Sequence, residues 1–159
     1  MELNKLYKVF AAIVICQLAG VLGSLFTYQS MPALYASLQK PLYAPPGWVF
    51  GPAWLTLYTL MGISLYLVWA KGLDDKEVKN AILIFGIQLG LNSIWSPIFF
   101  SLKNFMFAFI EILVLWAFIA ATIFSFHKIS KRAAWLLVPY ILWVSFAAML
   151  NYSVWMLNM

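Results

Sequence analysis

Five long stretches of the sequence carry almost no charge, and they limit the chain to folds that lipid, rather than water, surrounds. They cover residues 9–28, 48–70, 80–102, 104–126 and 133–159, and the only charged residue in any of them is Glu111. Each stretch reaches roughly the 20 residues that span a hydrocarbon core about 30 Å thick. Because backbone groups in lipid need hydrogen-bond partners within their own segment, each stretch is predicted to be a helix.

The fold class predicted from these stretches is an all-α membrane protein, a five-transmembrane-helix bundle that forms one domain over residues 1–159. Composition agrees, because 65% of the residues are hydrophobic and only 9% are charged. A soluble domain of this length cannot bury so much apolar side chain. We expect helices near residues 6–28, 47–70, 79–101, 104–126 and 132–156, with a loop at 29–46.

The basic residues lie between the apolar stretches and divide unevenly between the two ends of the predicted bundle. One end carries only Lys40 and Lys103. The other end carries eight: Lys5, Lys8, Lys71, Lys76, Lys79, Lys128, Lys131 and Arg132. This bias predicts a multi-pass protein with its N-terminus inside and its C-terminus outside. The net charge of +5 follows from this topology, so no nucleic-acid partner is expected.

Around the start of the second predicted helix the sequence reads LQKPLYAPPGWVFGPAW, residues 38–54. Pro45 and the proline after it cannot continue a helix, and Gly47 provides a flexible joint. Trp48 then stands at the helix end, where an interfacial aromatic belt explains it. Trp54 and Tyr58 lie deeper, where such a belt does not explain them.

The third stretch has two distinct faces. Its polar and aromatic face carries, at spacings of four, three and four, Gln88, Asn92, Trp95 and Phe99. The opposite face carries the pair Gly86 and Gly90, whose G-x-x-x-G spacing often lines a helix–helix contact. The two amides are costly in lipid and should point into the bundle. Interhelical hydrogen bonding and contact with a ligand explain them equally well.

The fourth and fifth stretches carry further candidates. Glu111 is either a functional intramembrane carboxyl or, as we favour, a neutral hydrogen-bonded one. Pro97 and Pro139 should kink the helices in which they occur. One face of the fifth stretch carries Tyr140, Trp143, Ala147, Asn151 and Val154.

Several kinds of chemistry have no residues to support them. The sequence has one histidine, one cysteine and no pair of intramembrane carboxylates, so neither a metal site nor a cofactor is expected. What remains is an aromatic interior with a few amides, which is typical of a pocket for a flat, mostly apolar ligand.

Three motifs carry a family resemblance over nearly the whole chain: KPLYAPPGWVFGPAWLTLY, QLGLNSIWSPIFF and WLLVPYILWVSFAAMLNYSVW. Together, in this order, they resemble the translocator protein family, also called tryptophan-rich sensory proteins or peripheral-type benzodiazepine receptors. The resemblance implies a bundle that is commonly a homodimer, with a first loop that folds over a pocket as a lid. It also suggests a prokaryotic member in a cell membrane.

The resemblance implies ligands and site residues as well. The family binds porphyrins such as protoporphyrin IX, and isoquinoline-carboxamide and benzodiazepine drugs. Some bacterial members are reported to degrade the porphyrin in light, and Trp54 and Trp143 match the tryptophans that would be catalytic. The dimer contact would fall on Gly86 and Gly90. The full set of expected ligand contacts is Pro45, Gly47, Trp48, Trp54, Tyr58, Gln88, Asn92, Trp95, Phe99, Trp143, Ala147 and Asn151.

Four functions follow, in our order of preference. The first is a receptor or sensor that binds a porphyrin, the second a light- and oxygen-dependent porphyrin-degrading enzyme, and the third a tetrapyrrole carrier. The fourth is a structural bundle whose aromatic residues only pack. Sterol import is not favoured, because Met156 stands where the animal members' motif needs a basic residue after Tyr152.

Overall fold

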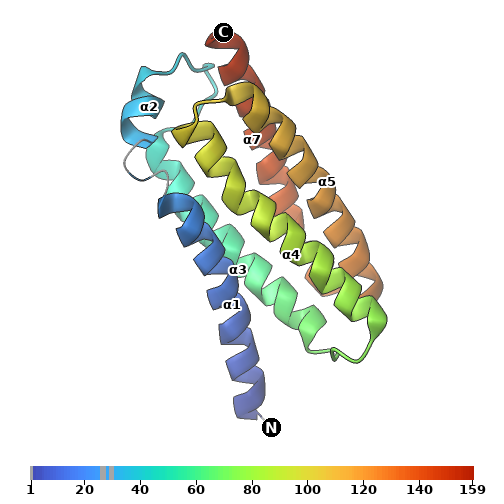
Figure 1. Ribbon diagram of the computed structural model, residues 1–159. Coiled ribbons are helices and arrows are strands. Elements are labelled where there is room, and N and C mark those ends of the chain that lie inside the picture. The colour runs from blue at the N-terminus through green and yellow to red at the C-terminus, as the bar shows by residue number, and fades with distance from the viewer. Residues whose placement is uncertain (1, 26–27, 29–30) are drawn as a thin grey trace.

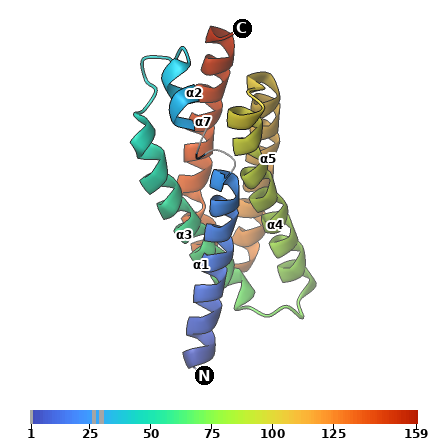
Figure 2. The ribbon, with the colours of Figure 1, turned by 60° about the vertical axis from the view of Figure 1, so that its left-hand side comes forward.

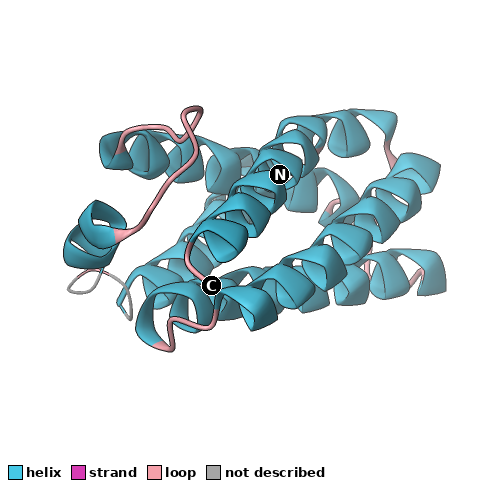
Figure 3. Ribbon diagram, turned by 90° about the horizontal axis from the view of Figure 1, so that it is seen from above, coloured by secondary structure: helices cyan, strands magenta, loops and turns pink. Residues whose placement is uncertain are grey.

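The computed structural model describes residues 2–25, 28 and 31–159. Residues 26–27, near the predicted end of the first helix, and 29–30, at the predicted start of the lid, lie outside the described residues. All regular structure in the described part is helical (Figure 3). The five long helices are α1 (Glu2–Leu25), α3 (Phe50–Trp69), α4 (Lys76–Ser96), α5 (Phe105–Ile129) and α7 (Val138–Leu157).

These long helices form a bundle with the N-terminus and the C-terminus at opposite ends (Figure 1). Helix α1 packs on α3 and α4, α4 packs on α5, and α5 packs on α7. Five helical segments within the described residues are long and apolar enough to cross a membrane. The predicted fold class, an all-α bundle of five transmembrane helices, is confirmed.

Prolines break the predicted third and fifth helices. Helix α4 ends at Ser96, and Pro97 begins a single turn of π-helix, η2 (Pro97–Ser101). The predicted fifth helix is two helices, α6 (Lys131–Leu136) and α7, which are separated by Leu137, and Pro139 is the second residue of α7. A proline has no N–H to donate to the preceding turn, so it sits in the first turn of a new element.

The predicted lid loop contains a helix of its own, α2 (Met31–Ser37), before the short turn η1 (Gly47–Val49). Helix α2 lies beside the C-terminal end of α7 (Figure 2). Its Leu34 is buried in an apolar cluster with Ile98, Phe99 and Leu150. The lid is therefore folded onto the end of the bundle by its own core contact.

Small residues bring α1 and α3 into close contact. A Cβ atom added at Gly62 would lie 2.5 Å from the Cα of Ile13, and one added at Gly20 would lie 2.4 Å from the Tyr58 ring. Ala12 and Cys16, on the same face of α1 as Gly20, are fully buried. The small residues of α1 thus serve packing within the chain.

Candidate ligand-binding site

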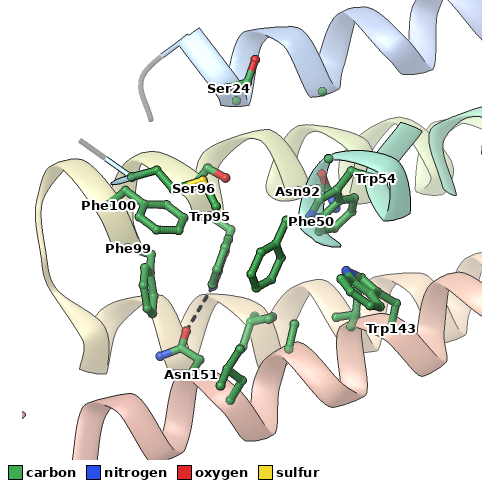
Figure 4. A pocket seen from close by; sticks show the side chains of 18 of the residues that line it. Ser24, Phe50, Trp54, Asn92, Trp95, Ser96, Phe99, Phe100, Trp143 and Asn151 are labelled. Atoms are coloured by element: carbon green, nitrogen blue, oxygen red, sulfur yellow. Dashed lines mark hydrogen bonds between the residues drawn. The ribbon is translucent and has the colours of Figure 1, made fainter. Parts of the chain in front are cut away.

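A cavity of about 580 Å³ lies at the end of the bundle that carries the lid (Figure 4). Its walls come from α1, α3, α4, α5, η2 and α7, and α2 and η1 of the lid contribute Tyr35 and Trp48. Ten of the twelve predicted contact residues line it: Gly47, Trp48, Trp54, Tyr58, Asn92, Trp95, Phe99, Trp143, Ala147 and Asn151.

The other two predicted residues, Pro45 and Gln88, lie outside the wall. The Pro45 carbonyl accepts a hydrogen bond of 2.6 Å from the hydroxyl of Tyr35. Gln88 is 1% exposed, and its Oε1 accepts a hydrogen bond of 2.9 Å from the hydroxyl of Tyr140. Both support residues around the cavity instead of facing it.

A chain of buried hydrogen bonds joins three helices behind the cavity. The Tyr58 hydroxyl donates to Oδ1 of Asn92, and Nδ2 of Asn92 donates to the Tyr140 hydroxyl over 2.9 Å. Tyr140 in turn donates to Gln88. The two amides of α4 therefore differ in position. Gln88 forms a hydrogen bond between helices and does not line the cavity, whereas Asn92 forms such bonds and also lines the cavity.

Aromatic rings cover much of the cavity wall. Trp54 stacks on Tyr58 with ring centres 5.4 Å apart, and Trp95 stacks on Phe99 at 5.0 Å. Phe50 meets Trp143 edge to face at 6.1 Å (Figure 4). These pairs hold the indole rings in fixed orientations, so the flat apolar faces in the cavity are preorganised.

One hydrogen-bonded link ties the last turn of α4 to α7 at the lid end. The indole N–H of Trp95 donates to Oδ1 of Asn151 over 3.2 Å, the dashed line in Figure 4. Nδ2 of Asn151 donates to the backbone carbonyl of Phe105 over 2.9 Å. Asn151 therefore fixes both the Trp95 ring and the start of α5.

The lid is fastened at two points, to α7 and to Asn158, the residue that follows α7. The Tyr43 hydroxyl and Oγ of Ser153 are 2.6 Å apart. Further along, the Gln39 N–H donates to Oδ1 of Asn158 over 3.0 Å, and Nδ2 of Asn158 donates to the Gln39 carbonyl over 2.9 Å. Within the lid, partial burial raises the pKa of Tyr35 above its ordinary value.

Comparison of the sequence with known protein families identifies the family of the chain. The model of the TspO/MBR family matches residues 12–156. The chain belongs to the TspO/MBR family. The resemblance predicted from the three motifs is thereby confirmed.

Individual relatives with related names are similar to the chain over most of its length. The chain is 42% identical to the tryptophan-rich protein TspO of Archaeoglobus fulgidus, over 95% of this chain and 97% of the relative. It is 40% identical to the protein of the same name from Chlorobaculum tepidum, over 91% of each chain. It is also 40% identical to the translocator protein of Bos taurus, over 89% of this chain and 84% of the relative.

Membership of the TspO/MBR family supports a role as a membrane receptor or sensor. With its five apolar helices, the chain is a multi-pass membrane protein. The predicted membrane context is confirmed, and the ligand, the oligomeric state and the orientation of the termini stay predictions.

The glycine pair of α4 faces outward in this family member. Gly86 and Gly90 are exposed, and a Cβ atom added at either would meet nothing within 4 Å. Ser93, further along α4, donates a hydrogen bond of 3.0 Å to the Ala19 carbonyl of α1. The glycine pair therefore lies on the outer surface of α4, whereas Ser93 contacts α1.

The expectation that Glu111 is hydrogen-bonded is wrong for the described residues. Its side chain is 8% exposed in α5, and both carboxyl oxygens lack a hydrogen-bond partner there. It faces its neighbours in the bundle and does not line the cavity.

Sequence reasoning missed the wall residues Tyr35 and Phe50 and the lid fastening through Gln39 and Asn158. Phe50 lies in the quoted stretch at residues 38–54, four residues before Trp54, so helical spacing could have found it. Gln39 and Asn158 are 119 residues apart, and no local pattern joins them.

Proposed function

We propose that this protein is a membrane receptor or sensor that binds porphyrins such as protoporphyrin IX in the cavity beneath its lid. Isoquinoline-carboxamide and benzodiazepine drugs would bind in the same place. One observation carries the proposal: a cavity of about 580 Å³ lined by aromatic rings and uncharged polar groups, in a chain of the TspO/MBR family.

The size and chemistry of the cavity support this ligand class. Small-molecule pockets are commonly about 300–1,000 Å³, mostly apolar, with a few placed polar groups. A flat ring system can stack on Trp54 and Trp143, which line the cavity from α3 and α7. Each aromatic pair adds about 0.5–1.5 kcal/mol beyond burial.

A titration with protoporphyrin IX in the dark, followed by quenching of tryptophan fluorescence, tests the proposal. Ala147 lines the cavity on α7, whereas Met149 on the same helix is 60% exposed and faces away. We expect saturable quenching of the wild type, affinity at least tenfold weaker for Ala147→Phe, and unchanged affinity for Met149→Phe. Equal effects of the two substitutions, or quenching that never saturates, would contradict binding in the cavity.

A second candidate function is light- and oxygen-dependent breakdown of the bound porphyrin. It is favoured because both candidate catalytic tryptophans, Trp54 and Trp143, line the cavity. Illuminating the complex in air should then bleach the porphyrin, and Trp143→Phe should slow the bleaching more than it weakens binding. If wild type and variant bleach at the rate of free porphyrin, the binding function stands without the enzyme.

Two further expectations belong to this proposal. A homodimer would form through the exposed Gly86 and Gly90 of α4, since glycines let helices approach closely in lipid. The lid would lie on the outer side of the membrane, because the basic residues gather at the opposite end of the bundle.

A further inference from the structure

The cavity carries no charged side chain among the residues that line it. Its polar groups are hydroxyls and amides, such as those of Gln17, Tyr58 and Asn92. Burying an ionised carboxylate without a cation is very costly. A ligand that is flat and apolar but carries carboxylates must therefore place them at the edge of the cavity.

The lid supplies one cation at that edge. Lys40 is the single charged residue between residues 28 and 47. Lys40 does not itself line the cavity, but its ammonium lies 4.6 Å from the centre of the ring of Tyr35, which does. The ammonium donates one hydrogen bond to the Tyr35 backbone carbonyl. A lysine has three N–H donors, so donors remain for an incoming carboxylate.

Other charges are poorly placed to serve the cavity or to neutralise Lys40. Apart from Lys40 and Lys103, the chain has eight basic residues. They belong to the start of α1 and to the α3–α4 and α5–α6 junctions, at the opposite end of the bundle (Figure 1). Asp74, Asp75 and Glu77 lie at that same far end. Lys103 is on the lid side, but it is exposed in the turn between η2 and α5.

We propose that Lys40 recognises a carboxylate of the bound ligand and so selects acidic ring systems over neutral ones of the same shape. The inference rests on the proposed function, since it assigns the acid group of a porphyrin that lies in the cavity. The ring would stack within the cavity while its carboxylate meets the ammonium at the Tyr35 edge. Neutral drugs would not use this contact.

A purely structural role makes a different prediction. If Lys40 only braces the lid, through the Tyr35 ring and carbonyl, its loss loosens the lid for every ligand. Acidic and neutral ligands would then weaken together. A pair of ligands that differ only in charge separates the two roles.

The test compares protoporphyrin IX with its dimethyl ester, which has the same ring and no charge. Both are titrated in the dark into wild type, Lys40→Gln, Lys40→Arg and the control Lys103→Gln. Lys40→Gln should weaken binding of the acid about five- to tenfold, in the range of a partly buried charge-assisted contact, and leave the ester unchanged. Lys40→Arg should keep most of the acid affinity, and Lys103→Gln should change neither ligand.

Each contrary result has a definite meaning. Equal weakening of acid and ester by Lys40→Gln would make Lys40 a lid brace and overturn the inference. An unchanged acid affinity would also overturn it, because the carboxylates then face water. If wild type binds neither acid nor ester, the proposed function itself fails. If both the acid and the ester bind and Lys40→Gln changes neither affinity, the proposed function is retained.

Discussion

The two ends of this bundle are built from the same helices but packed in opposite ways. At the end away from the lid, Gly62 lets α3 touch the backbone of α1, and Phe85 stacks on Phe126 with an interplanar angle of 12°. At the lid end the helices enclose about 580 Å³. One end therefore supplies stability, and the other supplies space for a ligand.

The largest expected difference in stability between the two ends comes from removing one aromatic ring at each end. Phe85 is 2% exposed in the core cluster, so Phe85→Ala should lower the free energy of unfolding by about 3 kcal/mol or more. Phe50 borders the cavity and is only partly buried, so Phe50→Ala should lower it by less than half as much. Thermal unfolding in detergent compares the two variants, and equal losses would contradict the contrast.

A smaller effect is expected from adding one methyl group to a glycine. Gly62→Ala forces a Cβ atom to 2.5 Å from the Ile13 backbone, so α1 must shift, at a cost of about 1–3 kcal/mol. Gly86→Ala, in the middle of α4 with nothing within 4 Å, should be neutral or slightly stabilising. Melting temperatures of the monomer in the same detergent test this, and a loss at Gly86 as large as at Gly62 would show that the outer face of α4 is also packed within the chain.

The smallest effect on stability, but a clear one on ligand kinetics, is expected at the lid fastening. Asn158→Ala removes both hydrogen bonds to Gln39, which are exposed and therefore worth only about 0.5 kcal/mol each. The melting temperature should hardly change, while protoporphyrin IX should dissociate several-fold faster in a stopped-flow displacement experiment. Dissociation at the wild-type rate would mean that this contact does not restrain the lid.

The helices could be predicted from the sequence better than the details of the cavity, and the reason is physical. Lipid imposes a length and a lack of charge on each span, so the five helices could be predicted from the charge-free stretches alone. Helical spacing also placed Asn92, Trp95 and Asn151 on the correct faces. Both rules are local, and they apply along the whole bundle.

The details that shape the cavity depend on tertiary contacts, which local rules do not contain. Helix α2 is only seven residues long and is held by burying Leu34 against η2 and α7. Gln88 and Asn92 share a face, and only the position of the cavity separates their roles. The two proline positions predicted a change in helix direction, but not that Pro97 would start a π-turn or that α7 would begin beyond Leu137.

The measurement that tests the central claim most directly is hydrogen–deuterium exchange with and without protoporphyrin IX, read separately for the two ends. If the ligand binds beneath the lid, amides of residues 31–46 should exchange more slowly in its presence, and those of residues 71–79 should be unchanged. The protection should disappear in Ala147→Phe and persist in Met149→Phe. Protection that avoids the lid, or that is centred on residues 71–79, would contradict the assignment of the lid-end cavity as the ligand site.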